Sequence, residues 1–212
     1  WLKRFIQIGT SEMYGSVEHP SKEDEPIKPS SPYAASKVAF DMHLMSVHKF
    51  LEFPMNIIRP SNAYCPGQLL HRVIPKAIIC GLTGEKLPLQ GGGKSEKSYI
   101  HARDLGKAIY LVSKKAPFGE VYNAGPENPT SIKDVVKFCA EALNMRFEDL
   151  CELAPDRLGQ DSRYWLDSTK IYKDVGWKAE IDWNIGLKEM VDWGIKYKEQ
   201  LIKWPKDYTL RA

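Results

Sequence analysis

The sequence has 212 residues, of which 43% are hydrophobic and 27% charged, a composition typical of a globular protein with one large domain or two small ones. Its 30 basic and 27 acidic residues leave a net charge of +3 without a dense run of Lys and Arg, so we expect no nucleic-acid partner. The apolar stretches are too short to cross a bilayer, so we expect no membrane association.

The four cysteines have neither paired nor metal-like spacing, which favours reduced thiols in the cytoplasm and no metal site.

Apolar runs, turn residues and helix caps predict strands that alternate with helices. In chain order we expect a strand at 4–9, an exposed loop at 16–31, a helix to about 51, a strand and then a loop within 55–62, a helix at 72–82, a strand and glycine turn at 86–93, a short strand and then a helix within 96–115, a strand at 120–125, a helix at 130–145 capped by Thr130, a strand near 163–168, and helices at 168–175 and 184–203. This alternation predicts an α/β fold.

Tyr33 and Lys37 stand four residues apart at the start of the first predicted helix, which Ser30 or Ser31 can cap. The spacing puts both side chains on one helix face, one turn apart. An ammonium group beside a phenol favours the phenolate, and such a tyrosine can exchange a proton with a substrate hydroxyl while hydride moves at the same carbon.

A second pair, Tyr110 and Lys114, repeats this spacing. It lies in an apolar run that ends in charged residues, so we interpret Tyr110 as core and Lys114 as solvated surface.

The first predicted strand is followed by the polar triplet Thr10, Ser11 and Glu12. Ligands of open α/β sheets bind beyond the carboxyl ends of the strands, so the triplet stands where a site is expected. The alternative is a turn whose polar side chains cap backbone groups.

Together these segments carry a family resemblance. GTSEMYG (9–15) followed by SPYAASK (31–37) resembles the active-site region of extended short-chain dehydrogenases/reductases, the NAD-dependent epimerase/dehydratase family. RPSNAYCPG (59–67) is similar to the family's R-x-x-N-x-Y-G-P segment, and YIHARDLGKAI (99–109) and VYNAG (121–125) match two further blocks. The block that begins DRLGQDSRY (156–164) is most like that of deoxythymidine-diphosphate-glucose 4,6-dehydratase.

The resemblance implies a hydride-transfer triad of Thr10, Tyr33 and Lys37. Tyr33 would be the acid/base at the sugar 4-hydroxyl, and Thr10 would hydrogen-bond the same oxygen. Lys37 would support Tyr33 and hold the nicotinamide ribose of NAD, with Pro60 as a further cofactor contact.

The same resemblance places Glu12 at the position of the base that removes the C5 proton in 4,6-dehydratases, and Ser11 at that of the acid that helps water leave C6. Thymidine-sugar dehydratases carry Thr-Asp-Glu, whereas Thr-Ser-Glu is found in GDP-mannose 4,6-dehydratase and UDP-glucuronate decarboxylases. Serine is a far poorer acid than a carboxyl group. The C-terminal block therefore favours a dehydratase, while the triplet leaves a decarboxylase or an epimerase open.

By this resemblance, three residues stand at the positions of the family's ligands for the substrate diphosphate: Asn62 and Arg157, which match, and Lys97. Lys97 stands where the family usually has arginine, which keeps the charge but loses the bidentate fork.

The family's dinucleotide motif G-x-x-G-x-x-G does not occur in this sequence. We therefore expect the C-terminal part of a Rossmann-like, doubly wound parallel sheet with a smaller α/β substrate-binding domain, and about a hundred residues missing before Trp1. Residues 1–65 would end the NAD-binding domain and carry the catalytic helix. Residues 66–212 would mainly form the substrate-binding domain, with a segment near 99–125 that returns to the sheet.

The resulting hypothesis is an NAD-dependent nucleotide-sugar 4,6-dehydratase that acts as a homodimer on a nucleotide-diphosphate sugar. Its rivals are a 4-epimerase or UDP-glucuronate decarboxylase on the same scaffold, and a truncated, non-catalytic chain that binds sugar nucleotides.

Overall fold

The computed structural model describes residues 2–156 and 161–207, and the chain divides into two compact units. The first unit takes Trp1–Ala63, Glu96–Pro129 and Gly159–Glu180, and the second takes Tyr64–Ser95, Thr130–Leu158 and Ile181–Ala212.

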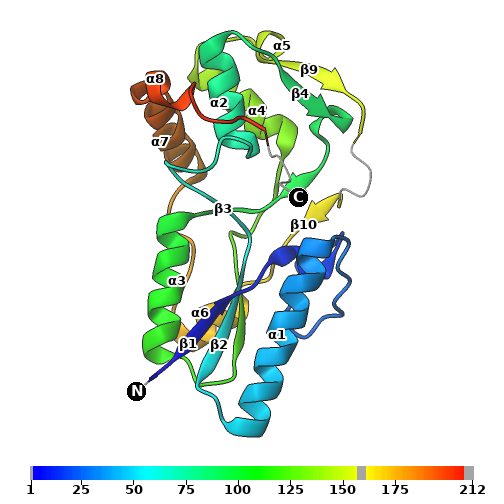
Figure 1. Ribbon diagram of the computed structural model, residues 1–212, viewed down its shortest axis with the longest axis vertical. Coiled ribbons are helices and arrows are strands. Elements are labelled where there is room, and N and C mark those ends of the chain that lie inside the picture. Colours follow the sequence, from blue (N-terminus) through cyan, green and yellow to red (C-terminus); the bar gives the residue numbers. More distant parts are fainter. Residues whose placement is uncertain (1, 157–160, 208–212) are drawn as a thin grey trace. The chain divides into compact units, whose positions relative to one another are not determined.

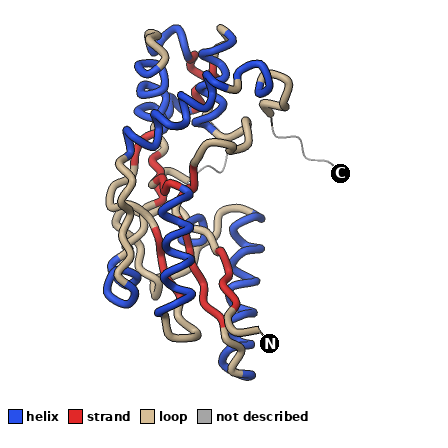
Figure 2. The backbone as a smooth tube through the Cα atoms, turned by 90° about the vertical axis from the view of Figure 1, so that its left-hand side faces the viewer, coloured by secondary structure: helices blue, strands red, loops and turns tan. Residues whose placement is uncertain are grey.

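The first unit is built on a parallel sheet of three strands in the order β1 (Phe5–Ile8), β2 (Met55–Pro60) and β7 (Val121–Ala124). Helix α1 (Pro32–Leu51) covers one face, and α3 (Ala102–Lys115) and α6 (Thr169–Val175) cover the other (Figures 1 and 2). Every residue of the central strand β2 is buried, as expected of a parallel strand covered on both sides.

The sheet has a hydrophobic core on each face. Neighbouring residues of one strand contribute to different cores, because successive side chains of a strand point to opposite faces. Ile57 packs in a cluster with Leu44 of α1, whereas Ile58 packs in a cluster with Val112 of α3. The unit is therefore a three-layer α/β/α structure.

Short elements complete the first unit around the carboxyl end of this sheet. They are the 3-10 helix η1 (Ser11–Tyr14), β5 (Glu96–Lys97), β6 (Tyr99–His101) and β10 (Arg163–Tyr164). β5 and β10 pair in parallel, and an isolated bridge joins Ser21 to Leu166.

The second unit is mainly helical, with α2 (Val73–Thr83) packed against α4 (Ile132–Ala142) and α7 (Trp183–Lys196). β4 (Leu87–Gln90) and β9 (Cys151–Ala154) form a parallel pair. Gly194 lets α7 approach α2 closely, since a Cβ there would lie 2.4 Å from a methyl carbon of Ile78. The remaining elements among the described residues are β3 (Asn62–Tyr64), η2 (Gly91–Gly93), β8 (Thr130–Ser131), α5 (Phe147–Leu150) and α8 (Lys198–Leu201).

The predicted α/β class with parallel sheets is confirmed. Three local predictions are wrong. Ser131, not Thr130, caps α4, because its hydroxyl accepts from the Asp134 N–H at 3.0 Å. The helix predicted at 184–203 is two helices, α7 and α8, which meet at Tyr197. Tyr110 is 60% exposed and is not a core residue.

The two units differ from the predicted domains in one segment, and the binding roles of those domains stay predictions. The first unit also includes 159–180, a segment that the sequence assigned to the substrate-binding domain. It belongs there because β10 pairs with β5 and α6 packs on β7.

Within residues 2–156 and 161–207, no helix has both the length and the apolar character needed to span a membrane, and no group of three or more His, Cys, Asp or Glu side chains could hold a metal ion. All four cysteines are free thiols.

Candidate active site at the carboxyl end of the sheet

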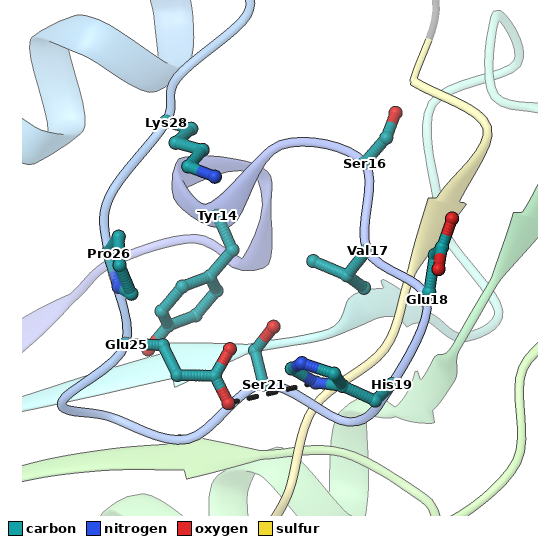
Figure 3. A pocket seen from close by; sticks show the side chains of 9 residues that line it. All are labelled: Tyr14, Ser16, Val17, Glu18, His19, Ser21, Glu25, Pro26 and Lys28. Carbon is teal, nitrogen blue, oxygen red and sulfur yellow. Dashed lines mark ion pairs between the residues drawn. The ribbon is translucent and has the colours of Figure 1, made fainter.

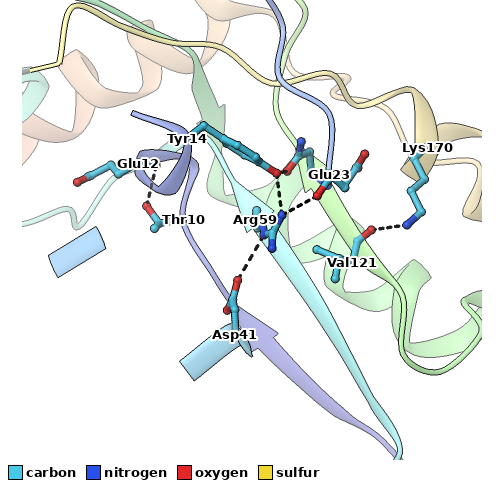
Figure 4. A network of polar contacts seen from close by, with 9 residues as sticks. Thr10, Glu12, Tyr14, Glu23, Asp41, Arg59, Val121 and Lys170 are labelled. Atoms are coloured by element: carbon cyan, nitrogen blue, oxygen red, sulfur yellow. Dashed lines mark hydrogen bonds and ion pairs between the residues drawn. The ribbon is translucent and has the colours of Figure 1, made fainter. Parts of the chain in front are cut away.

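The triplet predicted after the first strand forms a tight turn. Thr10 is the N-cap of η1, and its hydroxyl accepts from the Glu12 N–H at 3.2 Å (Figure 4). Thr10 and Ser11 are buried, and Glu12 is half-buried. The triplet therefore does form a turn in which a polar side chain caps a backbone group. The same bond fixes Glu12 near the end of β1.

The predicted tyrosine–lysine pair opens α1. Ser31 caps the helix by accepting from the Ala34 N–H at 3.1 Å, and Pro32 takes the first helical position. Tyr33 is 54% exposed and Lys37 is half-buried. Because α1 packs against η1, the structure brings the helix of Tyr33 and Lys37 together with the turn of Thr10, Ser11 and Glu12.

The predicted residues Pro60 and Asn62 flank the end of β2. Pro60 pairs with Ala124 of β7 and lies beyond the pairing with β1, where its missing N–H costs no ladder bond. Asn62 donates its backbone N–H to the Ser98 carbonyl at 3.0 Å. The predicted diphosphate ligand Arg157 lies outside the described residues.

A buried arginine joins the segments of this site, and sequence reasoning missed it. Nε of Arg59 lies 3.3 Å from Oδ2 of Asp41 on α1 (Figure 4). Its Nη1 donates to the Tyr14 hydroxyl at 2.8 Å and to the Glu23 carbonyl at 3.1 Å. Arg59 and Asp41 are 2% and 0% exposed. Burial raises the pKa of Asp41, although the charges of Arg59 and Lys37 act in the opposite direction.

The network continues to β7 through Asn123. The Tyr14 hydroxyl donates to Oδ1 of Asn123 at 3.0 Å, and the Asn123 amide donates to the Ser21 carbonyl at 2.9 Å. The backbone N–H of Asn123 donates to Oε1 of Glu23 at 2.7 Å. These bonds fasten the loop at 16–31, which leads into Tyr33, to the sheet.

The predicted ligand Lys97 lies in a second buried cluster. It is 6% exposed, and its ammonium group donates to the Asp161 carbonyl at 2.8 Å and lies 3.5 Å from the centre of the Tyr164 ring. Burial lowers the pKa of Lys97 to about 8, against the opposing charges of Asp161 and Glu12. The electrostatic contact with Glu12 connects this cluster to the triplet.

The Asp161 carboxylate gathers three hydroxyl donors: Ser16 at 2.9 Å, Tyr164 at 2.7 Å, and Ser30. Burial alone would raise the pKa of Asp161, but these bonds and the charge of Lys97 outweigh it and hold the pKa below its usual value. Asp161 thus connects both ends of the loop at 16–31 with β10.

A cavity of about 300 Å³ lies beside this loop (Figure 3). Tyr14 and residues of 16–28 line it, and its wall includes a His19–Glu25 contact of 3.8 Å. None of the predicted site residues is among its described lining, so we do not assign it to the candidate site.

Comparison with known proteins agrees with this arrangement. The family model for GDP-mannose 4,6 dehydratase matches residues 2–190. The chain belongs to the GDP-mannose 4,6-dehydratase family. The family resemblance seen in the sequence is therefore confirmed.

Curated relatives within this family include dTDP-glucose 4,6-dehydratases. The chain is 36% identical to the enzyme of Streptomyces griseus over 179 residues, which cover 84% of this chain and 54% of that protein. It is 34% identical to the enzyme of Neisseria gonorrhoeae, with 82% of this chain and 54% of that protein covered. The chain thus spans about half the length of these relatives.

Solved structures of dehydratases and epimerases share the fold of this chain. A dTDP-glucose 4,6-dehydratase of Bacillus anthracis in complex with NAD matches with a TM-score of 0.90 and 32% identity, over 94% of this chain and 64% of that one. A UDP-glucose 4-epimerase of Thermotoga maritima with UDP-glucose matches with a TM-score of 0.87 and 26% identity, over 93% and 65%.

The lowered pKa of Lys97 can be tested by the pH dependence of the free energy of unfolding. The folded chain releases its proton near pH 8, whereas an unperturbed lysine keeps it to about 10.5, so between these values the unfolded state binds more protons. The free energy of unfolding of the wild type should therefore rise, relative to that of Lys97→Met, as pH increases from about 7 to about 10.

Urea denaturation of both proteins at several pH values measures this difference. Lys94→Met, which replaces an exposed lysine nearby, controls for the loss of one positive charge. A difference between wild type and Lys97→Met that stays constant with pH would contradict the assignment.

Proposed function

We propose that the protein carrying this chain is an NAD-dependent nucleotide-sugar 4,6-dehydratase. The observation that carries the proposal is the packing of the Thr10–Glu12 turn against the helix that presents Tyr33 and Lys37. The dehydratases among its relatives and structural neighbours support the same reaction class.

The residues at the carboxyl end of the sheet fit the nicotinamide end of NAD. Parallel strands β1 and β2 end side by side there, and Tyr33 is exposed. The buried hydroxyl of Ser61, next to Pro60, has no hydrogen-bond partner in the part of the chain that the structure describes, so a polar ligand can satisfy it. NAD would supply the hydride acceptor for C4 and later the hydride donor for C6.

The side chains can then perform the proton transfers. Tyr33, supported by Lys37, takes the proton of the sugar 4-hydroxyl, and Thr10 orients that oxygen. The resulting 4-ketone acidifies the C5 hydrogen, which Glu12 removes. Because Ser11 is a poor acid, we propose that Glu12 passes this proton to the C6 hydroxyl, which leaves as water. In the last step C6 would gain the hydride, and C5 would gain a proton equivalent to the one first taken from the 4-hydroxyl, from Tyr33 or from solvent.

We propose that Asn62, Lys97 and Arg157 bind the substrate diphosphate. Lys97 already donates to the Asp161 carbonyl, so a phosphate oxygen would have to share or replace that acceptor. A single ammonium group would supply charge without the fork of an arginine.

An epimerase remains the second candidate, because the Thermotoga maritima epimerase shares this fold at 26% identity. Incubation with NAD⁺ and a panel of nucleotide sugars separates the candidates. A 4-keto-6-deoxy product, seen by its absorbance in alkali, indicates a dehydratase. An inverted C4 hydroxyl indicates an epimerase, CO₂ release a decarboxylase, and binding without turnover a non-catalytic chain.

The acid/base assignment predicts that Tyr33→Phe lowers kcat about 10²-fold or more, because the variant lacks the phenolate oxygen that accepts the proton. Substrate binding, measured by calorimetry, should be retained. Tyr110→Phe is the matched control, since Tyr110 is similarly exposed and has a lysine at the same spacing. Equal activity of the two variants would defeat the assignment.

The role of Glu12 predicts a different defect. Glu12→Gln should still oxidise C4, since Tyr33 and Lys37 are intact, but should not eliminate water. Reduced nicotinamide should therefore accumulate on the enzyme in a single turnover without 6-deoxy product, as measured by absorbance and mass spectrometry. Normal elimination by this variant would exclude Glu12 as the base.

We also propose that the protein lies in the reducing cytoplasm, because its four cysteines are free thiols.

We propose further that the protein forms a homodimer through α1. Apolar side chains that α1 leaves exposed support the dimer: Phe40, Met42, Met45, Phe50 and Leu51. Phe40→Glu should shift the protein to a monomer in light scattering, whereas Tyr172→Glu, at an exposed position on α6, should not. An unchanged mass for Phe40→Glu, or a monomeric wild type, would contradict the dimer through α1.

A further inference from the structure

Arg59 and Asp41 form an ion pair directly beneath the start of the candidate site. A Cβ on Gly9 would lie 3.0 Å from Cγ of Arg59 and 3.1 Å from Oδ2 of Asp41. The pair therefore occupies the space in which any side chain at position 9 would stand, and Thr10 follows at once. Gly9 is thus a close-approach glycine that lets the pair pack against the end of β1.

Asp41 ties the pair to the helix of the candidate acid/base. It lies one turn after Lys37 on the same helix, so its carboxylate and the Lys37 ammonium interact electrostatically. Arg59, from the central strand, is thus linked to the helix that carries Tyr33 and Lys37.

The other side of Arg59 binds the segments before that helix. The bond from its Nη1 to the Tyr14 hydroxyl holds the last residue of η1, and the bond to the Glu23 carbonyl holds the following loop. One side chain therefore contacts three segments that meet at the site, each of them covalently continuous with a predicted catalytic residue.

Stability alone is a weak reason for this arrangement. Burying an ion pair costs desolvation that its attraction often fails to exceed. Here Oδ1 of Asp41 is buried without a hydrogen-bond partner in the described part of the chain, which adds to the cost. Apolar residues of similar volume would fill the same space without this cost.

We propose that Arg59, with Asp41 and Tyr14, is a positioning residue for the proposed reaction: it holds the Thr10–Glu12 turn in fixed register with Tyr33 and Lys37. It does so without touching substrate. The proposal rests on the proposed function. Because small displacements of catalytic groups lower the rate strongly, loosening the network should lower kcat much more than it raises KM.

The mildest test compares two hydroxyl deletions. Tyr14→Phe removes the bonds to Arg59 and Asn123 and leaves the ring in place. Tyr122→Phe is the matched control: Tyr122 is also buried, and its hydroxyl donates at 3.0 Å to Asp174, which does not bond to Arg59, Tyr14 or Asp41. We expect Tyr14→Phe to lower kcat about tenfold or more with KM within about twofold, and Tyr122→Phe to keep the wild-type kcat.

A double variant separates positioning from stability. Asp41→Asn combined with Arg59→Gln removes both charges together and leaves no charge buried alone, so the protein should fold. The kcat of this double variant should be as low as that of Tyr14→Phe. The single variant Arg59→Lys, which keeps the charge, should have a kcat between those of the double variant and the wild type. A wild-type kcat in Tyr14→Phe or in the folded double variant would overturn the proposal.

Amide hydrogen exchange gives a readout without substrate. Tyr14→Phe should speed exchange in residues 10–14 and 33–37, and Tyr122→Phe should not. If the wild type turns over none of the nucleotide sugars, the proposed function fails, and this exchange pattern alone then decides whether Arg59 fixes the two segments. Unchanged exchange in Tyr14→Phe would overturn that as well.

Discussion

The buried pair of Arg59 and Asp41 is the interaction on which the rest of the site depends. The catalytic groups that we propose come from two segments, the Thr10–Glu12 turn and the first turns of α1, which a loop at 16–31 separates. Arg59 contacts η1, the loop and α1 from the central strand, and Gly9 gives the pair the room it needs. The sheet thus fixes the geometry of residues that project beyond it.

A second buried cluster completes the arrangement from the other end of the loop. Asp161 receives Ser16 and Ser30, which begin and end that loop, and its carbonyl receives Lys97. The Lys97 charge also interacts with Glu12. The loop is therefore held at Ser16, Ser21, Glu23 and Ser30, and its turn into α1 is defined before Tyr33 is reached. Polar contacts fix this segment, whose sequence is too polar to bury a core of its own.

Much of the fold and the choice of candidate site residues could be predicted from the sequence, because the patterns behind both are local. The strands around Ile57 and Val121, the Ser31 cap and the Tyr33–Lys37 spacing are each set by neighbouring residues. The Arg59 network was not predicted, since its partners lie 18 to 45 residues away. Its signal was present as a charged residue within the buried run MNIIRP, where an arginine needs a partner. The prediction that Tyr110 is a core residue was wrong, because apolar neighbours in the sequence do not determine which face of a helix is covered.

The most direct measurement is a crystal structure of the protein with NAD and an unreactive analogue of a nucleotide sugar. The account predicts that the sugar O4 accepts or donates hydrogen bonds with both the Thr10 hydroxyl and the Tyr33 hydroxyl, with the Glu12 carboxylate beside C5. A sugar bound elsewhere, or a Tyr33 hydroxyl turned away from it while Thr10 stays in contact, would contradict the account.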